Sequence, residues 1–147
     1  GSGRELCWFP DPVGPRDCYR FGTAEPVLLQ RVVPSVQRIT ARVSATRRDR
    51  LTARLPMMSP PHAEGGVGGL RVELRGVRQG ARHEEIVGIA DRLATVSGAV
   101  AAESVMAVMA GTIAPGVRIL GTEGVPNADL LDAVLAHGIA LHRYTGN

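Results

Sequence analysis

The segment Leu70–Gly76, "LRVELRG", alternates apolar residues with charged ones. Because side chains alternate between the two faces of a β-strand, this pattern predicts a strand with one buried face and one polar face. Gln79-Gly80 supplies a turn, and "ARHEEIVGIA", residues 81–90, predicts a returning strand. We therefore expect a β-hairpin in this part of the chain.

The residues after the hairpin are apolar without alternation. The stretch "DRLATVSGAVAAESVMAVMAG", residues 91–111, is apolar around most of a helical circumference and predicts a buried helix. Small residues would let this helix lie close to a sheet, namely Gly98, Ala99, Ala101 and Ala102. Gly111 suits the C-terminal cap.

Shorter elements are expected on both sides of this unit. Residues 26–33 predict a helix with proline at its first position, residues 35–44 a strand, and residues 47–55 a helix that ends before Pro56. Residues 59–69 predict a flexible loop. Asn127 can cap a helix over residues 128–137 that Gly138 closes, and residues 139–144 predict a last strand.

The expected order β–α–β–α–β–β–α–α–β indicates an α+β fold, with a mainly antiparallel sheet and helices packed on one face. At 147 residues we expect one domain, residues 4–147, after a vector-derived scar at residues 1–3. The polar sheet face, with Arg71, Glu73 and Arg75, should then meet water or another protein.

Composition argues against several function classes. All 17 basic residues are arginines, and the net charge of +3 is spread along the chain rather than gathered as in a nucleic-acid binder. No apolar run approaches the length of a membrane span. The two cysteines, Cys7 and Cys18, make neither a metal site nor a disulfide framework, which favours a reduced, cytoplasmic protein.

Residues with catalytic or metal-binding chemistry do not form a recognisable set. No two of the four histidines, His62, His83, His137 and His142, have the spacing of a helical metal pair, and each is expected to be structural. Glu84 and Glu85 are adjacent on a strand and point to opposite faces. Glu103, within the apolar helix, is expected at its exposed edge; a salt bridge to a strand arginine is the alternative. We expect no catalytic and no metal-binding residues.

Several segments, taken together in order, resemble the C-terminal part of saccharopine dehydrogenase-like oxidoreductases. They are "FPDPVGPRDCY", residues 9–19; the alternating strand Arg71–Gly76; Thr95-Val96-Ser97-Gly98 with Ala101-Ala102; Gly111–Val117; and "LLDAVLAHGI", residues 130–139. The spacing between Thr95 and Gly98 is one residue longer than in the family pattern. The match extends from about residue 9 to residue 139.

The resemblance implies a two-domain enzyme. In that family an N-terminal Rossmann domain binds NAD or NADP, and the C-terminal α+β domain closes over the cofactor, shapes the substrate pocket and often forms a homodimer through its sheet. This sequence has no Rossmann fingerprint, so the resemblance implies the second domain alone, with no cofactor-binding residues and no activity by itself. The Rossmann domain of the same protein would be its partner.

The proline-rich loop "PDPVGPR", residues 10–16, would then form a rigid edge near the interdomain cleft. Gly14 would allow a tight turn and Pro15 would fix its exit. The candidate substrate-binding residues are Arg16, whose guanidinium could bind a substrate carboxylate, with Tyr19 and Asp11 nearby. The alternative is that Asp11 and Arg16 pair with each other across the loop.

A second function class remains open. The chain could be a stand-alone interaction module that dimerises through the polar sheet face and has no catalytic activity. The coding sequence upstream of residue 4 distinguishes the two hypotheses, because only the oxidoreductase predicts a G-x-G-x-x-G strand–turn–helix there.

Overall fold

The computed structural model describes residues 3–52, 55 and 65–145. Within them the chain forms two three-stranded antiparallel sheets with strand orders β1-β2-β3 and β4-β5-β6. The elements in chain order are β1 (Glu5–Trp8), β2 (Pro15–Arg20), α1 (Glu25–Val32), β3 (Arg42–Ser44), α2 (Arg47–Thr52), β4 (Val67–Arg78), β5 (Ala81–Arg92), α3 (Leu93–Met109), α4 (Asn127–Leu135) and β6 (Leu141–Thr145). The predicted α+β class with antiparallel strands is confirmed, but two sheets take the place of the expected single one.

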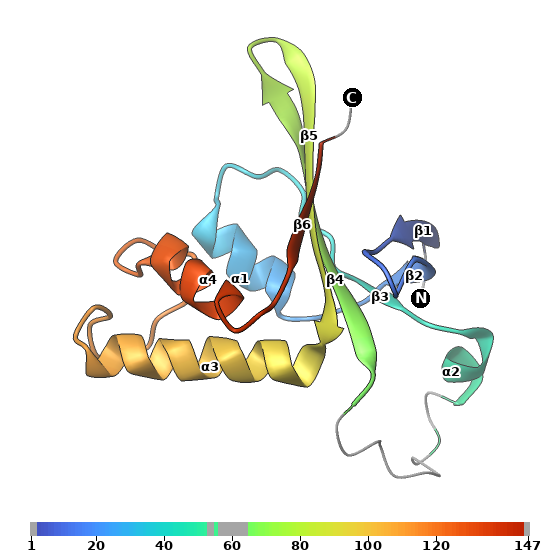
Figure 1. Cartoon of the computed structure of the whole chain (residues 1–147). Coiled ribbons are helices and arrows are strands. Elements are labelled where there is room, and N and C mark those ends of the chain that lie inside the picture. The colour runs from blue at the N-terminus through green and yellow to red at the C-terminus, as the bar shows by residue number, and fades with distance from the viewer. Residues whose placement is uncertain (1–2, 53–54, 56–64, 146–147) are drawn as a thin grey trace.

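The long hairpin β4–β5 is the largest element of the fold. Its strands pair from Val67↔Arg92 to Arg78↔Ala81, so the strand expected from residue 70 begins three positions earlier. Gln79 and Gly80 form the two-residue turn with φ of 53° and 78°, the left-handed geometry that suits the twist of a hairpin. The tip of this hairpin extends beyond the helices (Figure 1).

Helices α3 and α4 lie on one side of the β4-β5-β6 sheet, and the β1-β2-β3 sheet lies on the other side (Figure 1). The main core cluster joins Ile89 of β5 to Ala99 of α3 and to Val134 and Ile139 at the end of the chain. Val96, Val100 and Leu135 pack against this cluster. The buried contact between the helices and this sheet therefore lies at β5 and at Ile139, just before β6.

The opening proline-rich segment is a hairpin turn rather than an isolated loop. β1 and β2 pair from Glu5↔Cys18 to Trp8↔Pro15, and the Phe9 N–H donates to the Gly14 carbonyl at 3.2 Å. Gly14 has φ of 64°, so the predicted tight turn is confirmed at the residue that tolerates it best. The Asp11-Pro12 peptide bond is cis.

Two predicted elements are wrong in extent. The strand expected over residues 35–44 is reduced to β3, because β2 pairs only through Cys18, Tyr19 and Arg20. A β-branched sequence without a partner strand has no ladder to join. Of the helix expected over residues 47–55, the structure describes α2 over Arg47–Thr52 and a bend, not helix, at Leu55. Residues 53–54 and 56–64, with most of the expected flexible loop, lie outside the described residues.

The prediction that residues 91–111 form a buried helix is wrong about burial. Of the residues of α3 only Ala99 is buried, whereas Val105, Met106, Val108 and Met109 are exposed. One side of this helix contacts β5, the start of β4 and α4, and the exposed residues lie in its C-terminal half. Gly111, with φ of 74°, follows the helix end as predicted.

The start of α4 also differs from the prediction. Asn127 is the first helical residue and does not cap the helix. Its side chain accepts a hydrogen bond from the Gly121 N–H at 2.7 Å and donates to the Thr122 carbonyl at 3.1 Å, so it fixes the preceding loop. Gly138, with φ of 84°, follows the helix as expected.

Candidate functional site

The apolar face of β4 is largely uncovered. Leu70 pairs with Ile89 and Val72 with Val87, so these side chains share the sheet face on which α3 and α4 lie. Ile89 is buried, yet Leu70, Val72 and Leu74 are 50%, 44% and 60% exposed. The prediction that this face is buried is therefore wrong for most of β4, because α3 contacts β4 only at its start, where Leu93 lies against Gly68. We call Leu70, Val72 and Leu74 the apolar stripe.

The opposite face of β4 carries a network of ion pairs. Arg71 contacts Glu73 at 2.5 Å, Glu73 also pairs with Arg75, and Arg75 Nε donates to Glu84 at 2.8 Å. The side chains of Arg71 and Glu73 are only 18% and 17% exposed, whereas Arg75 is 68% exposed. The face that was predicted to meet water or another protein is therefore partly covered by the chain itself. The hydrogen bond from Arg75 lowers the pKa of Glu84, and the same bond raises the pKa of Arg75.

The proline-rich turn explains part of this burial. A Cβ at Gly69 would lie 2.6 Å from Phe9, and one at Gly88 would lie 3.1 Å from Pro10. Two glycines on adjacent strands thus let the turn after β1 rest directly on the sheet. The rigid proline-rich turn therefore forms the contact between the two sheets.

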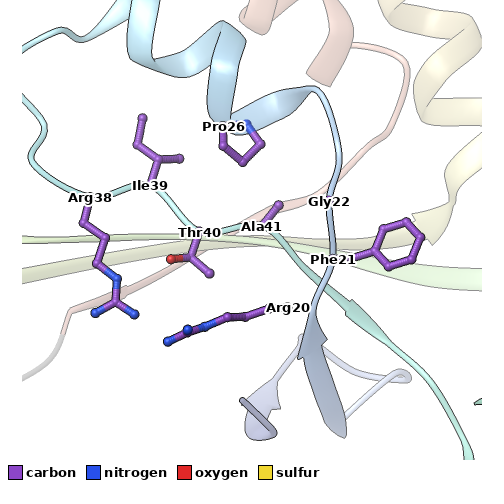
Figure 2. A pocket seen from close by; sticks show the side chains of 8 residues that line it. All are labelled: Arg20, Phe21, Gly22, Pro26, Arg38, Ile39, Thr40 and Ala41. Carbon is purple, nitrogen blue, oxygen red and sulfur yellow. The ribbon is translucent and has the colours of Figure 1, made fainter. Parts of the chain in front are cut away.

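A hollow of about 360 Å³ lies between the end of β2 and the chain before β3 (Figure 2). Its lining includes Arg20 and Arg38, with Thr40, and the apolar side chains of Phe21, Pro26 and Ile39. Both arginine side chains extend toward the same side of the hollow, whereas the ring of Phe21 points away from them (Figure 2). Among the described residues neither arginine has an ion-pair partner, so the hollow carries two uncompensated positive charges.

The candidate substrate-binding residues of the opening segment are not gathered at one point. Arg16 and Tyr19 are three positions apart on β2 and therefore point to opposite faces. Arg16 Nη1 donates to the Pro15 carbonyl at 3.0 Å, and Tyr19 lines a second hollow with Arg4 and Asp17. Asp11 lies in the turn, and in the described chain no ion pair joins it to Arg16. The substrate role of these three residues stays a prediction.

Sequence reasoning did not select Arg20 and Arg38. They are separated by helix α1, and neither is part of a recognisable motif, so only the fold brings them to one hollow. The sequence offered only a weak indication that these two arginines could bind an anion, namely that neither has an acidic residue immediately beside it.

Glu103 has a partner that the sequence did not suggest. Its Oε1 lies 2.7 Å from Nε2 of His137, which follows the end of α4. This contact ties α3 to α4. Glu103 is partly exposed, and its partner is His137, so the alternative bridge to a strand arginine is wrong. His62 lies outside the described residues, and no group of three or more His, Cys, Asp or Glu in the described chain could hold a metal ion.

Cys7 and Cys18 are both buried free thiols of the first sheet. Burial, and next the neighbouring Cys7, raise the pKa of Cys18 to about 12. A thiol with such a pKa stays protonated near neutral pH and is a poor nucleophile.

No helix in the described part of the chain combines the length and apolar character that crossing a bilayer requires. No protein-family model matches the sequence, and the search among curated proteins found no similar sequence.

Proposed function

We propose that this chain is the substrate-binding and dimerisation domain of a saccharopine dehydrogenase-like oxidoreductase, without activity of its own. The observation that carries the proposal is the uncovered apolar stripe on β4, beside a face whose charged side chains are satisfied. A contiguous apolar surface on an otherwise paired sheet is typical of a protein–protein contact. The proposal that the enzyme is an oxidoreductase of this family rests on the resemblance in sequence.

The second apolar surface suits the other contact that the resemblance implies. Val105, Met106, Val108 and Met109 give the C-terminal half of α3 an exposed apolar surface, and this half of the helix lies away from β4 (Figure 1). We assign this half of α3 to the N-terminal Rossmann domain, which would bring NAD or NADP, and the stripe to a second copy of the chain.

The substrate-binding part of the proposal rests on the hollow of Figure 2. Arg20 and Arg38 can donate several hydrogen bonds to a carboxylate, and the Thr40 hydroxyl adds another donor. The apolar lining of Pro26 and Ile39 would contact the carbon skeleton. A carboxylate of the substrate is therefore the group that this domain would hold, while hydride transfer would take place at the nicotinamide held by the other domain.

The upstream coding sequence and an activity assay test this proposal. A G-x-G-x-x-G strand–turn–helix before residue 4 is expected, and the longer protein should oxidise or reduce substrate with NAD or NADP, whereas the present chain should not. A start codon near Arg4 would contradict the proposal and favour the alternative, a stand-alone dimerisation module without catalytic activity.

A further inference from the structure

We propose that β4 pairs with β4 of a second copy, antiparallel and centred on Val72, so that two three-stranded sheets join into one of six strands. This inference rests on the proposed dimerisation and adds the surface and the register. Its starting point is the position of β4, which is the outermost strand of its sheet.

The outer edge of β4 is long and unpaired within the described chain. β4 has 12 residues, and β5 is the strand beside it in the sheet order. Unpaired edges of this length readily accept another strand. No proline interrupts the strand, and the charges of Arg71, Glu73 and Arg75 alternate in sign along it.

The turn fixes which backbone groups are available. In a hairpin with a two-residue turn, the residues that flank the turn point their N–H and C=O groups at each other. Arg78 and Ala81 flank this turn. Arg78 and every second residue before it, which are the even-numbered residues of β4, therefore direct their backbone N–H and C=O groups toward β5. The odd-numbered residues, including Arg71 and Glu73, therefore present their backbone groups to the outer edge.

Charge selects the register of a two-fold pair. When Val72 lies opposite its own copy, Arg71 lies opposite Glu73 of the partner and Glu73 opposite the partner's Arg71. Opposite charges directly across a strand pair stabilise it, and like charges destabilise it. A register centred on Glu73 would place the two Glu73 carboxylates together and Arg71 opposite the partner's Arg75, so it is disfavoured.

The apolar stripe selects between the registers that charge permits. Centring on Val72 also brings Leu70 opposite the partner's Leu74, so all three exposed apolar side chains meet apolar neighbours. Centring on Leu74 would keep a Glu73–Arg75 pair but would set Leu70 opposite the partner's Arg78 and Val72 opposite Gly76. Only the register centred on Val72 gives opposite-charge pairs on one face of the strand and apolar pairs on the other.

Two single charge reversals and their mixture test the register. Arg71→Glu places four glutamates in two opposed pairs, and Glu73→Arg places four arginines in the same way. Each variant alone should dimerise at least about tenfold more weakly than the unaltered chain. An equimolar mixture should regain dimerisation, because both glutamates of the first variant then face arginines of the second. Sedimentation velocity measures all three samples.

The control is Arg82→Glu, the same reversal on β5 near the hairpin tip, which should dimerise like the unaltered chain. Circular dichroism reports whether each variant folds, and recovery in the mixture is itself evidence of folded partners. An unaltered chain that remains monomeric contradicts the proposed dimer together with its register. A dimer that tolerates Arg71→Glu, or a mixture that stays monomeric, contradicts the register alone.

Discussion

The ring of Phe9 occupies the space that a side chain at Gly69 would need, because a Cβ there would lie 2.6 Å from its Cδ1. Phe9 belongs to the proline-rich turn and Gly69 to β4, so this contact joins the two sheets. Pro10 and Gly88 repeat the arrangement on the next strand. The close packing of the two sheets thus requires glycine, which has no side chain, at positions 69 and 88.

Gly69→Ala should therefore destabilise the chain. The added methyl group must displace an aromatic ring, and overpacking of this kind costs about 1–3 kcal/mol in the free energy of unfolding. Gly76→Ala on the same strand is the matched control, since nothing lies within 4 Å of its Cβ position. Urea denaturation of both variants measures the difference. Equal stabilities would show that the turn does not rest on β4.

The Glu103–His137 contact should stabilise the packing of α3 against α4. Replacing both residues with alanine, singly and together, should give a coupling energy of about 0.5–1.5 kcal/mol in a double-mutant cycle. The two side chains lie 2.7 Å apart and are partly exposed, so a larger value is not expected. A coupling energy of zero would mean that the pair makes no contribution in solution.

The thiol of Cys18 should be unreactive in the folded chain. In the Cys7→Ala variant it is the only thiol, and at pH 8 its alkylation should be at least about tenfold slower in the native state than in guanidinium chloride. In the unaltered chain, burial and next the contact with Cys7 raise the folded pKa of Cys18 from 9.0 to about 12. The protonated thiol there favours folding below pH 9, and this contribution is lost as the pH rises toward 12. Equal alkylation rates in the two states would contradict this prediction.

The hollow with Arg20 and Arg38 should bind a carboxylate. Titration with glutarate, followed by NMR shifts of the Thr40 amide, should show saturable binding that Arg38→Ala weakens about tenfold, the loss expected for a charge-assisted hydrogen bond. Arg16→Ala is the matched control and should leave the binding unchanged. Loss of binding in Arg16→Ala alone would favour the opening-segment candidates instead.

The sequence predicted the elements whose pattern is local. The alternation around Val72 and the Gln79-Gly80 turn are enough to identify the hairpin, since period and turn geometry depend on neighbours in the chain. The same alternation could not show that the apolar side of β4 is uncovered. That outcome depends on how far α3 and α4 extend across the sheet.

The site residues were harder to predict for the same reason. Arg20 and Arg38 lie at one hollow because the chain returns after α1 to pair as β3. Glu103 and His137 meet because α4 packs on α3. Each relationship is made by tertiary structure between segments that carry no shared motif, so spacing in the sequence does not reveal it.

The most direct test of the central claim is the mass of the chain in solution. Sedimentation equilibrium over a series of concentrations should show a monomer that converts to a species of twice its mass. Val72→Asp should abolish this conversion, and the same substitution at the exposed Val105 of α3 should leave it intact. A chain that stays monomeric at every concentration, or a Val72→Asp variant that dimerises like the unaltered chain, would contradict the claim that the apolar stripe is a contact surface.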